Sequence, residues 1–400
     1  MTRHRASAAL LAAGLALGLG ACGQAESPAP ATATLTATPP AAAKTAPPVP
    51  LSTAAASDWV ERSLAAMTLE QKAGQLVMAT ATAQTGTSAA AQAVADHHLG
   101  SVLLLGGGWG SAAEVKRAAD ALQAKNDAVA GLWIAVDQEG GRVQRLDGSG
   151  FDTIPSALDQ GQLSAQELES RALAWGEQLA AAGVNLNLAP VVDTVAAADR
   201  AANAPIGALD RDFGLDADGN AAHAAAFARG MAQAGVGAAL KHFPGLGRLS
   251  GNTDFTAQGI TDTATGPDDP SVRAFQQALA AAPTMVMMSL ATYTQLDPDA
   301  PAAFSEQVVG GLLRGQLGWD GVVISDSLTA AAVAGVPASE RAVRFVEAGG
   351  DLSCFGDLAG GLAALDGLIQ RARSDQAFAA LVDASARRVL AAKATAGLAQ

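Results

Sequence analysis

Short apolar runs alternate with longer amphipathic segments along the chain, from about residue 57 to its end. The runs are short enough for strands, whereas the segments between them repeat apolar residues at the three-to-four-residue spacing of a helix. This alternation is typical of repeated βα units around a parallel sheet. We expect strands at eight runs, namely Leu76–Met78, Ser101–Leu105, Trp133–Val136, Val184–Ala189, Gly237–Lys241, Thr284–Ser289, Gly321–Ser325 and Asp351–Phe355.

Several of the predicted helices end at a glycine just before the next strand. Gly183, Gly235 and Gly349 occupy such positions, which are typical of helix C-terminal stops. Eight βα units predict a single (β/α)8 barrel of the TIM type over residues 57–400. An open doubly wound sheet is the alternative, but no Gly-x-Gly-x-x-Gly motif opens a helix after the first strand. The predicted helices include Glu167–Ala182, Ala217–Ala234, Asp269–Ala281, Glu306–Gln316, Ala338–Ala348 and Gln376–Ala396.

The first 22 residues have the layout of a secretory signal peptide. Arg3 and Arg5 precede an apolar stretch, residues 8–19, that is too short to span a bilayer. The chain then reads Leu-Gly-Ala-Cys, ending at Cys22, which resembles the lipobox of bacterial lipoproteins. We therefore expect Cys22 to be lipidated, so that the protein is an extracytoplasmic lipoprotein anchored to the cell membrane. An ordinary cleaved signal with an incidental cysteine is the alternative.

Residues 23–56 consist mainly of Ala, Thr and Pro with little charge and no periodicity, so we expect a disordered tether there. Half of the whole chain is apolar and 16% is charged, which allows a substantial core. A formal net charge of −13 disfavours nucleic acid and anionic lipid surfaces as partners. If Cys22 is lipidated, Cys354 has no partner within the chain, and we expect it to be a buried structural thiol.

Charged side chains end or directly follow three of the predicted strands. Asp137 follows the third strand, Lys241 and His242 end the fifth, and Asp326 follows the seventh. In a parallel barrel these strand ends meet on the face where ligands bind. Arg145, a little beyond Asp137, can fork onto a carboxylate or an acyl oxygen. Taken singly, the aspartate at the seventh strand is equally well a helix N-cap, and a Lys-His pair is more often structural. Together the segments predict a binding or catalytic site.

These segments resemble the N-terminal barrel domain of family 3 glycoside hydrolases, specifically its single-domain bacterial β-N-acetylglucosaminidases. The resemblance covers most of the chain after the tether. The segments that carry it are Met67–Leu76, Val136–Arg145, Val184–Asp193, Lys241–Asp254 and Leu317–Asp326.

The resemblance implies a retaining β-N-acetylhexosaminidase that needs no cofactor or metal and removes terminal β-linked N-acetylglucosamine from cell-wall fragments. Asp326 is then the nucleophile that forms a covalent glycosyl-enzyme. We expect a monomer whose partner is the glycan substrate. The residues implied to hold the terminal sugar are Asp137, Arg145, Arg211, Lys241 and His242.

The loop after the fifth strand departs from the family pattern. Members of this subgroup usually carry His where Leu246 stands, Asp where Asn252 stands, and a general acid/base His where Asp254 stands; Leu290 also replaces a common pocket histidine. In one outcome Asp254 is the acid/base, with its pKa raised by apolar surroundings and by the charge of Asp326. In another the barrel binds sugar without turning it over, and a third is a β-glucosidase-type specificity. We expect the active β-N-acetylhexosaminidase.

Overall fold

A computed structural model describes residues 53–400. The predicted signal peptide with Cys22, and the predicted tether up to residue 52, lie outside the described residues. The first described helix, α1 (Thr53–Ala66), already contains the last four residues that we assigned to the tether. Within this described part, no helix is long and apolar enough to cross a membrane.

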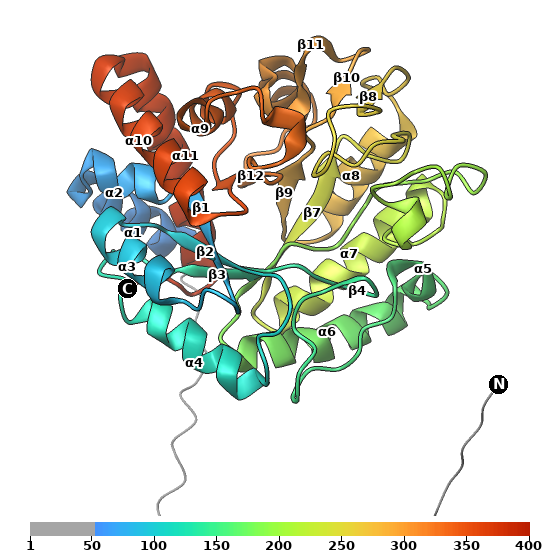
Figure 1. The fold of residues 1–400 in the computed structure, drawn as a ribbon, viewed down its shortest axis with the longest axis horizontal. Coiled ribbons are helices and arrows are strands. Elements are labelled where there is room, and N and C mark those ends of the chain that lie inside the picture. Colours follow the sequence, from blue (N-terminus) through green and yellow to red (C-terminus); the bar gives the residue numbers. More distant parts are fainter. Residues whose placement is uncertain (1–52) are drawn as a thin grey trace, which may run out of the picture. The chain divides into compact units, whose positions relative to one another are not determined.

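Eight parallel strands form the central sheet and follow one another around it in chain order. The ring closes between the last two strands, where Ile324 pairs with Leu352 and the Ser325 N–H donates to the Leu352 carbonyl oxygen at 3.0 Å. The predicted (β/α)8 barrel is therefore confirmed (Figure 1). The strands are β1 (Val77–Thr82), β2 (Ser101–Leu105), β3 (Trp133–Val136), β6 (Leu186–Asn187), β7 (Gly237–Phe243), β9 (Met285–Met288), β12 (Val323–Ser325) and β13 (Ser353–Cys354).

Each barrel strand overlaps the apolar run that predicts it. β2 and β3 match their runs residue for residue, whereas β1 begins one residue later than predicted and continues to Thr82. β7 extends two residues beyond its predicted end, so His242 belongs to the strand as well as Lys241. The extension fixes both of these side chains relative to the sheet.

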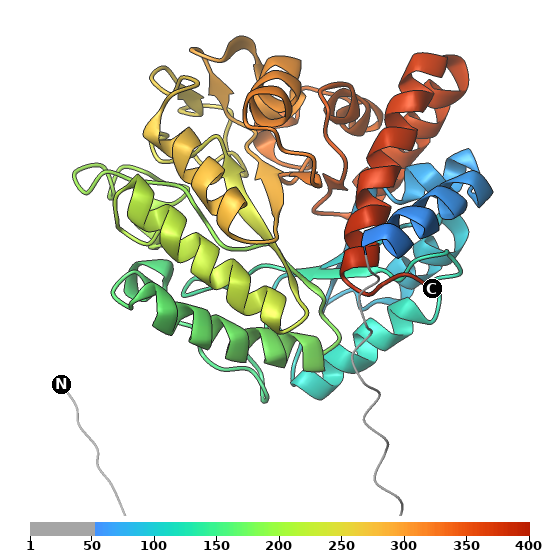
Figure 2. The ribbon, with the colours of Figure 1, turned by 180° about the vertical axis from the view of Figure 1, so that it is seen from behind.

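Three helices lie side by side along one flank of the barrel, α6 (Ala165–Ala181), α7 (Ala217–Gln233) and α8 (Pro270–Ala281), as Figure 2 shows from behind. Helix α7 contacts both of its neighbours, and α7 and α8 both pack on β7. Smaller elements complete the first half of the chain: α2 (Leu69–Gly74), α3 (Ser88–His97), α4 (Ala112–Gln123), α5 (Ala157–Gln160), η1 (Gly207–Leu209) and the hairpin of β4 (Gln138–Gly140) and β5 (Val143–Gln144).

The last helix, α11 (Gln376–Thr395), packs against the first, α1, so the two ends of the described chain are joined in one layer (Figure 2). Helix α10 (Leu358–Ser374), which we did not predict, packs against α9 (Ala338–Glu347) and α11. The remaining elements are β8 (Thr261–Asp262), β10 (Thr292–Tyr293), β11 (Asp297–Pro301), η2 (Ala302–Phe304) and η4 (Ala331–Val333).

The predicted helix over residues 306–316 forms a π-helix, η3 (Gln307–Gln316). The i→i−5 hydrogen bonding of a π-helix continues to the end of this segment, where the Leu317 N–H donates to the Leu312 carbonyl oxygen at 2.9 Å. The apolar periodicity identifies this segment as helical because Val308, Val309 and Leu312 face the core. Periodicity of this kind does not distinguish i→i−4 from i→i−5 hydrogen bonds.

The three predicted glycine stops adopt the left-handed conformation that a helix C-terminus favours. The φ angles are +78° at Gly183, +78° at Gly235 and +104° at Gly349. A side chain at these angles is strained, so glycine is the residue that lets the chain turn from helix to strand. These stops are confirmed.

Apolar side chains form two clusters, one inside the barrel and one between the sheet and the helices. On β3 the alternation is clear, because Trp133 and Ala135 belong to the interior cluster whereas Ile134 and Val136 belong to the outer one. Cys354 lies in the interior cluster and is 3% exposed, in agreement with the expected structural thiol. Other interior members are Met78, Leu103, Leu186, Leu188, Ala239, Met285, Met287, Ile324 and Leu352.

A buried lysine lies at the opposite end of the barrel from the strand carboxyl ends. Lys393, on the last turn of α11, donates to the Gln75 side-chain oxygen and the Gly100 carbonyl oxygen, each at 2.8 Å. Both acceptors precede a barrel strand, so the lysine ties α11 to the amino end of the sheet. Burial lowers the pKa of Lys393 to about 7, and no carboxylate among residues 53–400 forms an ion pair with it to oppose this.

Candidate active site

The strand alternation that fills the barrel also aims three charged side chains into it. Each lies two positions beyond an inward-facing core residue, at or just past the carboxyl end of its strand. Because alternate residues of a strand share a face, all three point toward the barrel axis. They are Asp137 after Ala135, Lys241 after Ala239 and Asp326 after Ile324.

A cavity of about 500 Å³ opens at this end of the barrel. Its floor includes Leu103, Leu188 and Met287, which form the top of the interior cluster. A volume of this size is ordinary for a small-molecule site. The structure brings together all seven residues predicted for catalysis or sugar binding, since each of them lines this cavity: Asp137, Arg145, Arg211, Lys241, His242, Asp254 and Asp326.

A network of buried ion pairs organises one wall of the cavity. The Lys241 Nζ lies 2.6 Å from an oxygen of Asp137 and 2.7 Å from an oxygen of Glu139. Glu139 also accepts two hydrogen bonds from Arg211, from Nε at 2.9 Å and from Nη2 at 2.8 Å. A bidentate arginine and a lysine on the same carboxylate fix all four side chains in one arrangement.

Opposing charges keep this network ionised although it is buried. Burial alone would raise the pKa of Glu139, but the charges of Arg211 and Lys241 outweigh it and hold that pKa well below its usual range. Burial likewise would lower the pKa of Lys241, and the charges of Asp137 and Glu139 raise it instead. The wall therefore presents Lys241 in its charged form beside an ionised Glu139.

Glu139 is the residue of this wall that our sequence analysis missed. It is 4% exposed and lies two positions after Asp137, in the β4 strand that follows the barrel strand. Arg211 has only part of its hydrogen-bonding capacity left, because Pro205 O accepts from Nη1 at 2.8 Å in addition to the two bonds to Glu139. One further N–H on each terminal nitrogen is free to meet a ligand.

His242 is held by a carboxylate beneath the site. Its Nδ1 lies 2.7 Å from Asp193, which also accepts from the backbone N–H of Leu246 at 2.8 Å. A carboxylate only accepts, so Nδ1 carries the proton and Nε2 is the nitrogen available to a ligand. The peptide bonds Lys241–His242 and Phe243–Pro244 are both cis. Asp193 thus fixes both the imidazole and the start of the loop that follows β7.

This β7 loop, residues 244–259, carries Asp254 to the mouth of the cavity. Within this loop, the Gly251 N–H donates to the Gly259 carbonyl oxygen at 2.8 Å and closes the outer turn, residues 251–259. The Asn252 side chain accepts from the Asp254 N–H at 2.9 Å, and the Asp254 carbonyl oxygen accepts from Ala331 at 3.2 Å. The loop is therefore bound on one side by its own turn and on the other by the segment after β12.

The environment of Asp254 raises the pKa of its carboxyl group above the ordinary value. The cavity wall raises the pKa of Asp254 to about 6 by partial desolvation, and the charge of Asp326 adds to the effect, whereas His242 and Arg211 oppose it. Asp254 remains open to solvent on its outer side. Asp254 and Asp326 line the same cavity.

Asp326 keeps one carboxylate oxygen free. Its Oδ1 accepts from the Ser327 N–H at 2.8 Å, and its own N–H donates to the Met288 carbonyl oxygen at 2.9 Å. Oδ2 has no hydrogen-bond partner among residues 53–400. The backbone and one oxygen are thus held by the ends of β9 and β12, while the other oxygen is available for chemistry.

Two arginines line the cavity without an ion-pair partner in the described part of the chain, Arg142 and Arg145. The Arg145 Nε is buried and has no hydrogen-bond partner there. The Arg145 backbone is fixed, because its N–H donates to the Gln138 side-chain oxygen at 3.0 Å. A buried guanidinium nitrogen that lacks a partner is costly unless a ligand satisfies it.

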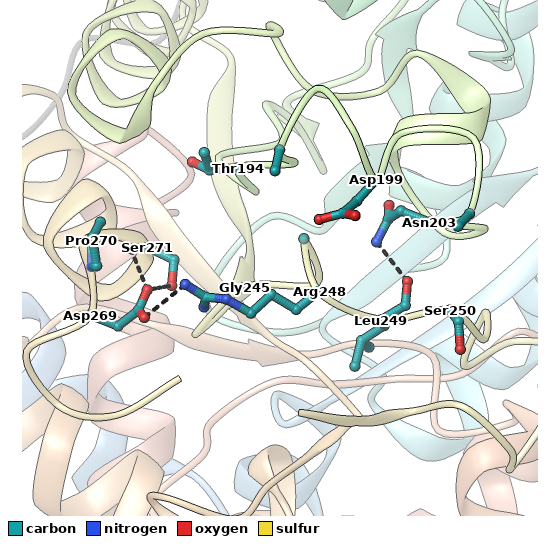
Figure 3. Close-up of a pocket in the computed structure, with 13 residues that line it drawn as sticks. Thr194, Asp199, Asn203, Gly245, Arg248, Leu249, Ser250, Asp269, Pro270 and Ser271 are labelled. Carbon is teal, nitrogen blue, oxygen red and sulfur yellow. Dashed lines mark hydrogen bonds and ion pairs between the residues drawn. The ribbon is translucent and has the colours of Figure 1, made fainter. Parts of the chain in front are cut away.

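A second cavity, of about 490 Å³, lies along the stem of the β7 loop (Figure 3). Figure 3 shows Arg248 reaching Asp269, at 2.9 Å, and the Asn203 amide meeting the Leu249 carbonyl oxygen, at 2.8 Å. The same amide donates to the Leu246 carbonyl oxygen at 2.8 Å. None of the seven predicted site residues lines this cavity. It marks where the stem of the loop is anchored.

Comparisons with known proteins show which proteins this chain is similar to. The solved β-N-acetylhexosaminidase of Beutenbergia cavernae is 46% identical, with a TM-score of 0.77, and the match covers 82% of this chain and 98% of that one. Mycobacterium tuberculosis LpqI is 30% identical, with a TM-score of 0.71 and coverage of 86% and 96%. A beta-hexosaminidase of Stenotrophomonas maltophilia (strain R551-3) is 40% identical over 226 residues, which span 52% of this chain and 63% of that protein.

The model of the glycosyl hydrolase family 3 N terminal domain matches residues 68–392, which include every barrel strand and all seven residues predicted for catalysis or sugar binding. The chain therefore belongs to glycosyl hydrolase family 3.

Proposed function

We propose that the protein is a retaining exo-β-N-acetylhexosaminidase that hydrolyses terminal β-linked N-acetylglucosamine. The observation that carries the proposal is that Asp326 and Asp254 line one cavity together with the five residues predicted to hold the sugar. The names of the related proteins from Beutenbergia and Stenotrophomonas support the choice of substrate. A family 3 fold alone would leave the sugar open, because one fold serves several specificities.

In the first step, the free oxygen of Asp326 attacks the anomeric carbon while Asp254 donates its proton to the glycosidic oxygen. The bond to the leaving group breaks, the leaving group departs as an alcohol, and the sugar becomes esterified to Asp326. In the second step, Asp254 takes a proton from water and the resulting hydroxyl attacks the same carbon. The Asp326 carboxylate is released, and Asp254 keeps the proton that it took from water, so the enzyme is regenerated.

The properties of Asp254 support its role as the acid/base, although the loop that carries it departs from the family pattern. Its pKa of about 6 makes it a competent proton donor at weakly acidic pH and a competent base after the first step. The buried Leu246, which lines the same cavity, supplies apolar surface near it. We propose that Asn252 aligns Asp254 through the hydrogen bond to its N–H, in place of orienting a histidine side chain.

The remaining residues bind the terminal sugar. In the proposal, Asp137 accepts from sugar hydroxyls, while Lys241 donates and holds the carboxylate. Nε2 of His242 and the free guanidinium N–H groups of Arg145 and Arg211 hydrogen-bond the ring substituents and the acyl oxygen. Glu139 does not need to touch the sugar, because it acts by orienting Arg211 and Lys241.

A comparison of two substrates tests the proposal. Wild-type enzyme should hydrolyse an aryl β-N-acetylglucosaminide much faster than an aryl β-glucoside, and the reverse preference would favour the β-glucosidase alternative. Asp326→Asn should lower kcat/KM roughly 10⁴-fold or more. Asp320→Asn, the same change at an exposed position before β12, is the control and should stay within twofold. Wild type that binds N-acetylglucosamine without any turnover would favour the sugar-binding alternative.

A leaving-group series tests the acid. Asp254→Asn should slow substrates with poor leaving groups roughly 10²–10⁴-fold, because these need protonation, and should slow good leaving groups far less. An equal loss for every leaving group would contradict the assignment of Asp254.

We also propose that the enzyme works outside the cytoplasm on cell-wall fragments, as a monomer held by a lipid on Cys22. The support is the residue pattern Leu-Gly-Ala-Cys after a short apolar stretch. Cys22→Ala should move the protein from the membrane fraction to the soluble fraction without changing kcat/KM. An unchanged membrane fraction would contradict the anchor.

A further inference from the structure

Phe255 is an unusual side chain for the position it occupies. It is 82% exposed, and only Leu381, at 40%, is also a large exposed apolar residue in the described part of the chain. Whereas Leu381 lies on α11 and away from both cavities, Phe255 lines the cavity that contains Asp254 and Asp326. An exposed aromatic ring at a cavity mouth is free to be covered by a ligand.

The position of Phe255 places it beside the leaving group. A general acid protonates the glycosidic oxygen, so it must stand on the side of the site from which the leaving group departs. Phe255 follows Asp254 directly and shares its turn. In the proposed function the terminal sugar binds beside Lys241, which is 2% exposed, whereas Phe255, at 82% exposed, lies on the solvent side of the same cavity.

The turn that carries the ring is fixed. The Asn252 carbonyl oxygen accepts from the N–H of Phe255 and from that of Thr256, each at 3.0 Å. Asp254, one residue earlier, is held by Ala331 and by the Asn252 side chain. A ring presented by a fixed turn requires little ordering when a ligand covers it.

We propose that Phe255 forms the platform of a leaving-group subsite, so that the enzyme favours leaving groups with a pyranose ring over small alcohols. The inference rests on the proposed function and specifies its substrate class. The face of a pyranose that carries axial C–H groups is apolar and flat, and it packs on an aromatic ring with loss of exposed apolar surface from both. Pro205 and Leu209 also line this cavity and add apolar surface to it.

Two substrates that need the acid equally test this inference. The disaccharide N,N′-diacetylchitobiose and methyl β-N-acetylglucosaminide both release an alkyl alcohol, but only the disaccharide offers a ring to Phe255. Phe255→Ala should lower kcat/KM roughly tenfold for the disaccharide and less than twofold for the methyl glycoside. Phe255→Tyr, which keeps the ring, should retain disaccharide activity within about threefold, and the control Leu381→Ala should change neither substrate.

The outcomes are distinguishable. A similar loss on both substrates would mean that the substitution displaces Asp254, and no loss on either would mean that the ring is not covered; each overturns the subsite. Wild type that cleaves neither substrate would overturn the proposed function itself, and the subsite with it.

Discussion

Two buried lysines, at opposite ends of the same barrel, have opposite electrostatic environments. Lys241, at the carboxyl end, is 2% exposed and lies within 2.7 Å of two carboxylates. Lys393, at the amino end, is fully buried and donates only to the neutral oxygens of Gln75 and Gly100. The pKa of Lys241 is raised by its partners despite burial, whereas burial lowers the pKa of Lys393 to about 7.

The comparison teaches how one fold separates binding from stability. At the carboxyl end, charge is retained because it is paired, and paired charges are what polar sugar hydroxyls can bind. At the amino end, Lys393 serves as a long hydrogen-bond donor that ties α11 to the sheet, and its charge is a cost. Substitutions at the two lysines should therefore have effects on different quantities.

Among substitutions away from the two catalytic carboxylates, Lys241→Met should have the largest effect. It leaves Asp137 and Glu139 as neighbouring buried carboxylates without their shared cation, so kcat/KM should fall roughly 10²–10³-fold. Unfolding free energy should also drop by about 3–5 kcal/mol, as for removal of one partner of a buried ion pair. Assays on an aryl β-N-acetylglucosaminide and urea unfolding measure the two effects. Lys393→Met is the matched control for activity and should stay within twofold; a Lys241 variant with more than a tenth of wild-type activity would refute the binding role.

Glu139→Gln should have the next largest effect. The amide keeps the shape of the side chain but loses the charge that orients Arg211 and Lys241, so we expect kcat/KM to fall roughly 10- to 100-fold, mainly through KM. Glu169→Gln provides the control, because Glu169 pairs with Arg229 at 2.8 Å on the surface and should affect neither activity nor stability by more than about 1 kcal/mol. Equal effects of the two variants would mean that Glu139 is only structural.

The pH dependence of kcat/KM should report the protonation of Asp254. A general acid acts in its protonated form, so the basic limb of the kcat/KM profile should fall from its plateau as pH rises above a pKa of about 6. At pH 7 it should be roughly tenfold below the plateau. In Asp254→Asn this basic limb should disappear for substrates with good leaving groups. A limb that persists in the variant would assign the titration to another residue.

Lys393 should affect only the stability of the protein and not its activity. Its folded pKa lies below its unfolded pKa, so between about pH 7 and pH 10 the unfolded chain binds the extra proton. The wild-type free energy of unfolding should therefore rise with pH across this window, by on the order of a few kcal/mol, and the gain is lost as pH falls toward 7. Urea unfolding at several pH values should show a flatter profile for Lys393→Met, while Lys125→Met, at an exposed position, keeps the wild-type slope. An unchanged slope in Lys393→Met would contradict this account.

Much of the fold could be predicted because its signals are local. Apolar runs and glycine stops such as Gly183 are properties of short segments, and both survive in the structure. The meeting of Asp137, Lys241 and Asp326 also follows from short-range rules, since strand alternation and a parallel barrel suffice to aim them at one axis. The roles of these residues stay predictions.

What sequence reasoning missed depends on contacts between distant segments. Glu139 lies in the same motif as Asp137, but its importance comes from Arg211, 72 positions later, which no local pattern reveals. The lowered pKa of Lys393 reflects burial without an ion-pair partner among residues 53–400, and a sequence does not show which residues will be neighbours. Phe255 reads as an ordinary apolar residue until its exposure is known.

The most direct test of the central claim is to trap the covalent intermediate. A 5-fluoro-N-acetylglucosaminyl fluoride should react quickly and hydrolyse slowly, because the ring fluorine destabilises the positive charge of both transition states while the fluoride leaving group favours the first step. Peptide mass mapping should then find one sugar per chain on the peptide that contains Asp326, and none in Asp326→Asn. A label on another residue of an enzyme that turns over its substrate, or turnover with no label at all, would contradict the account.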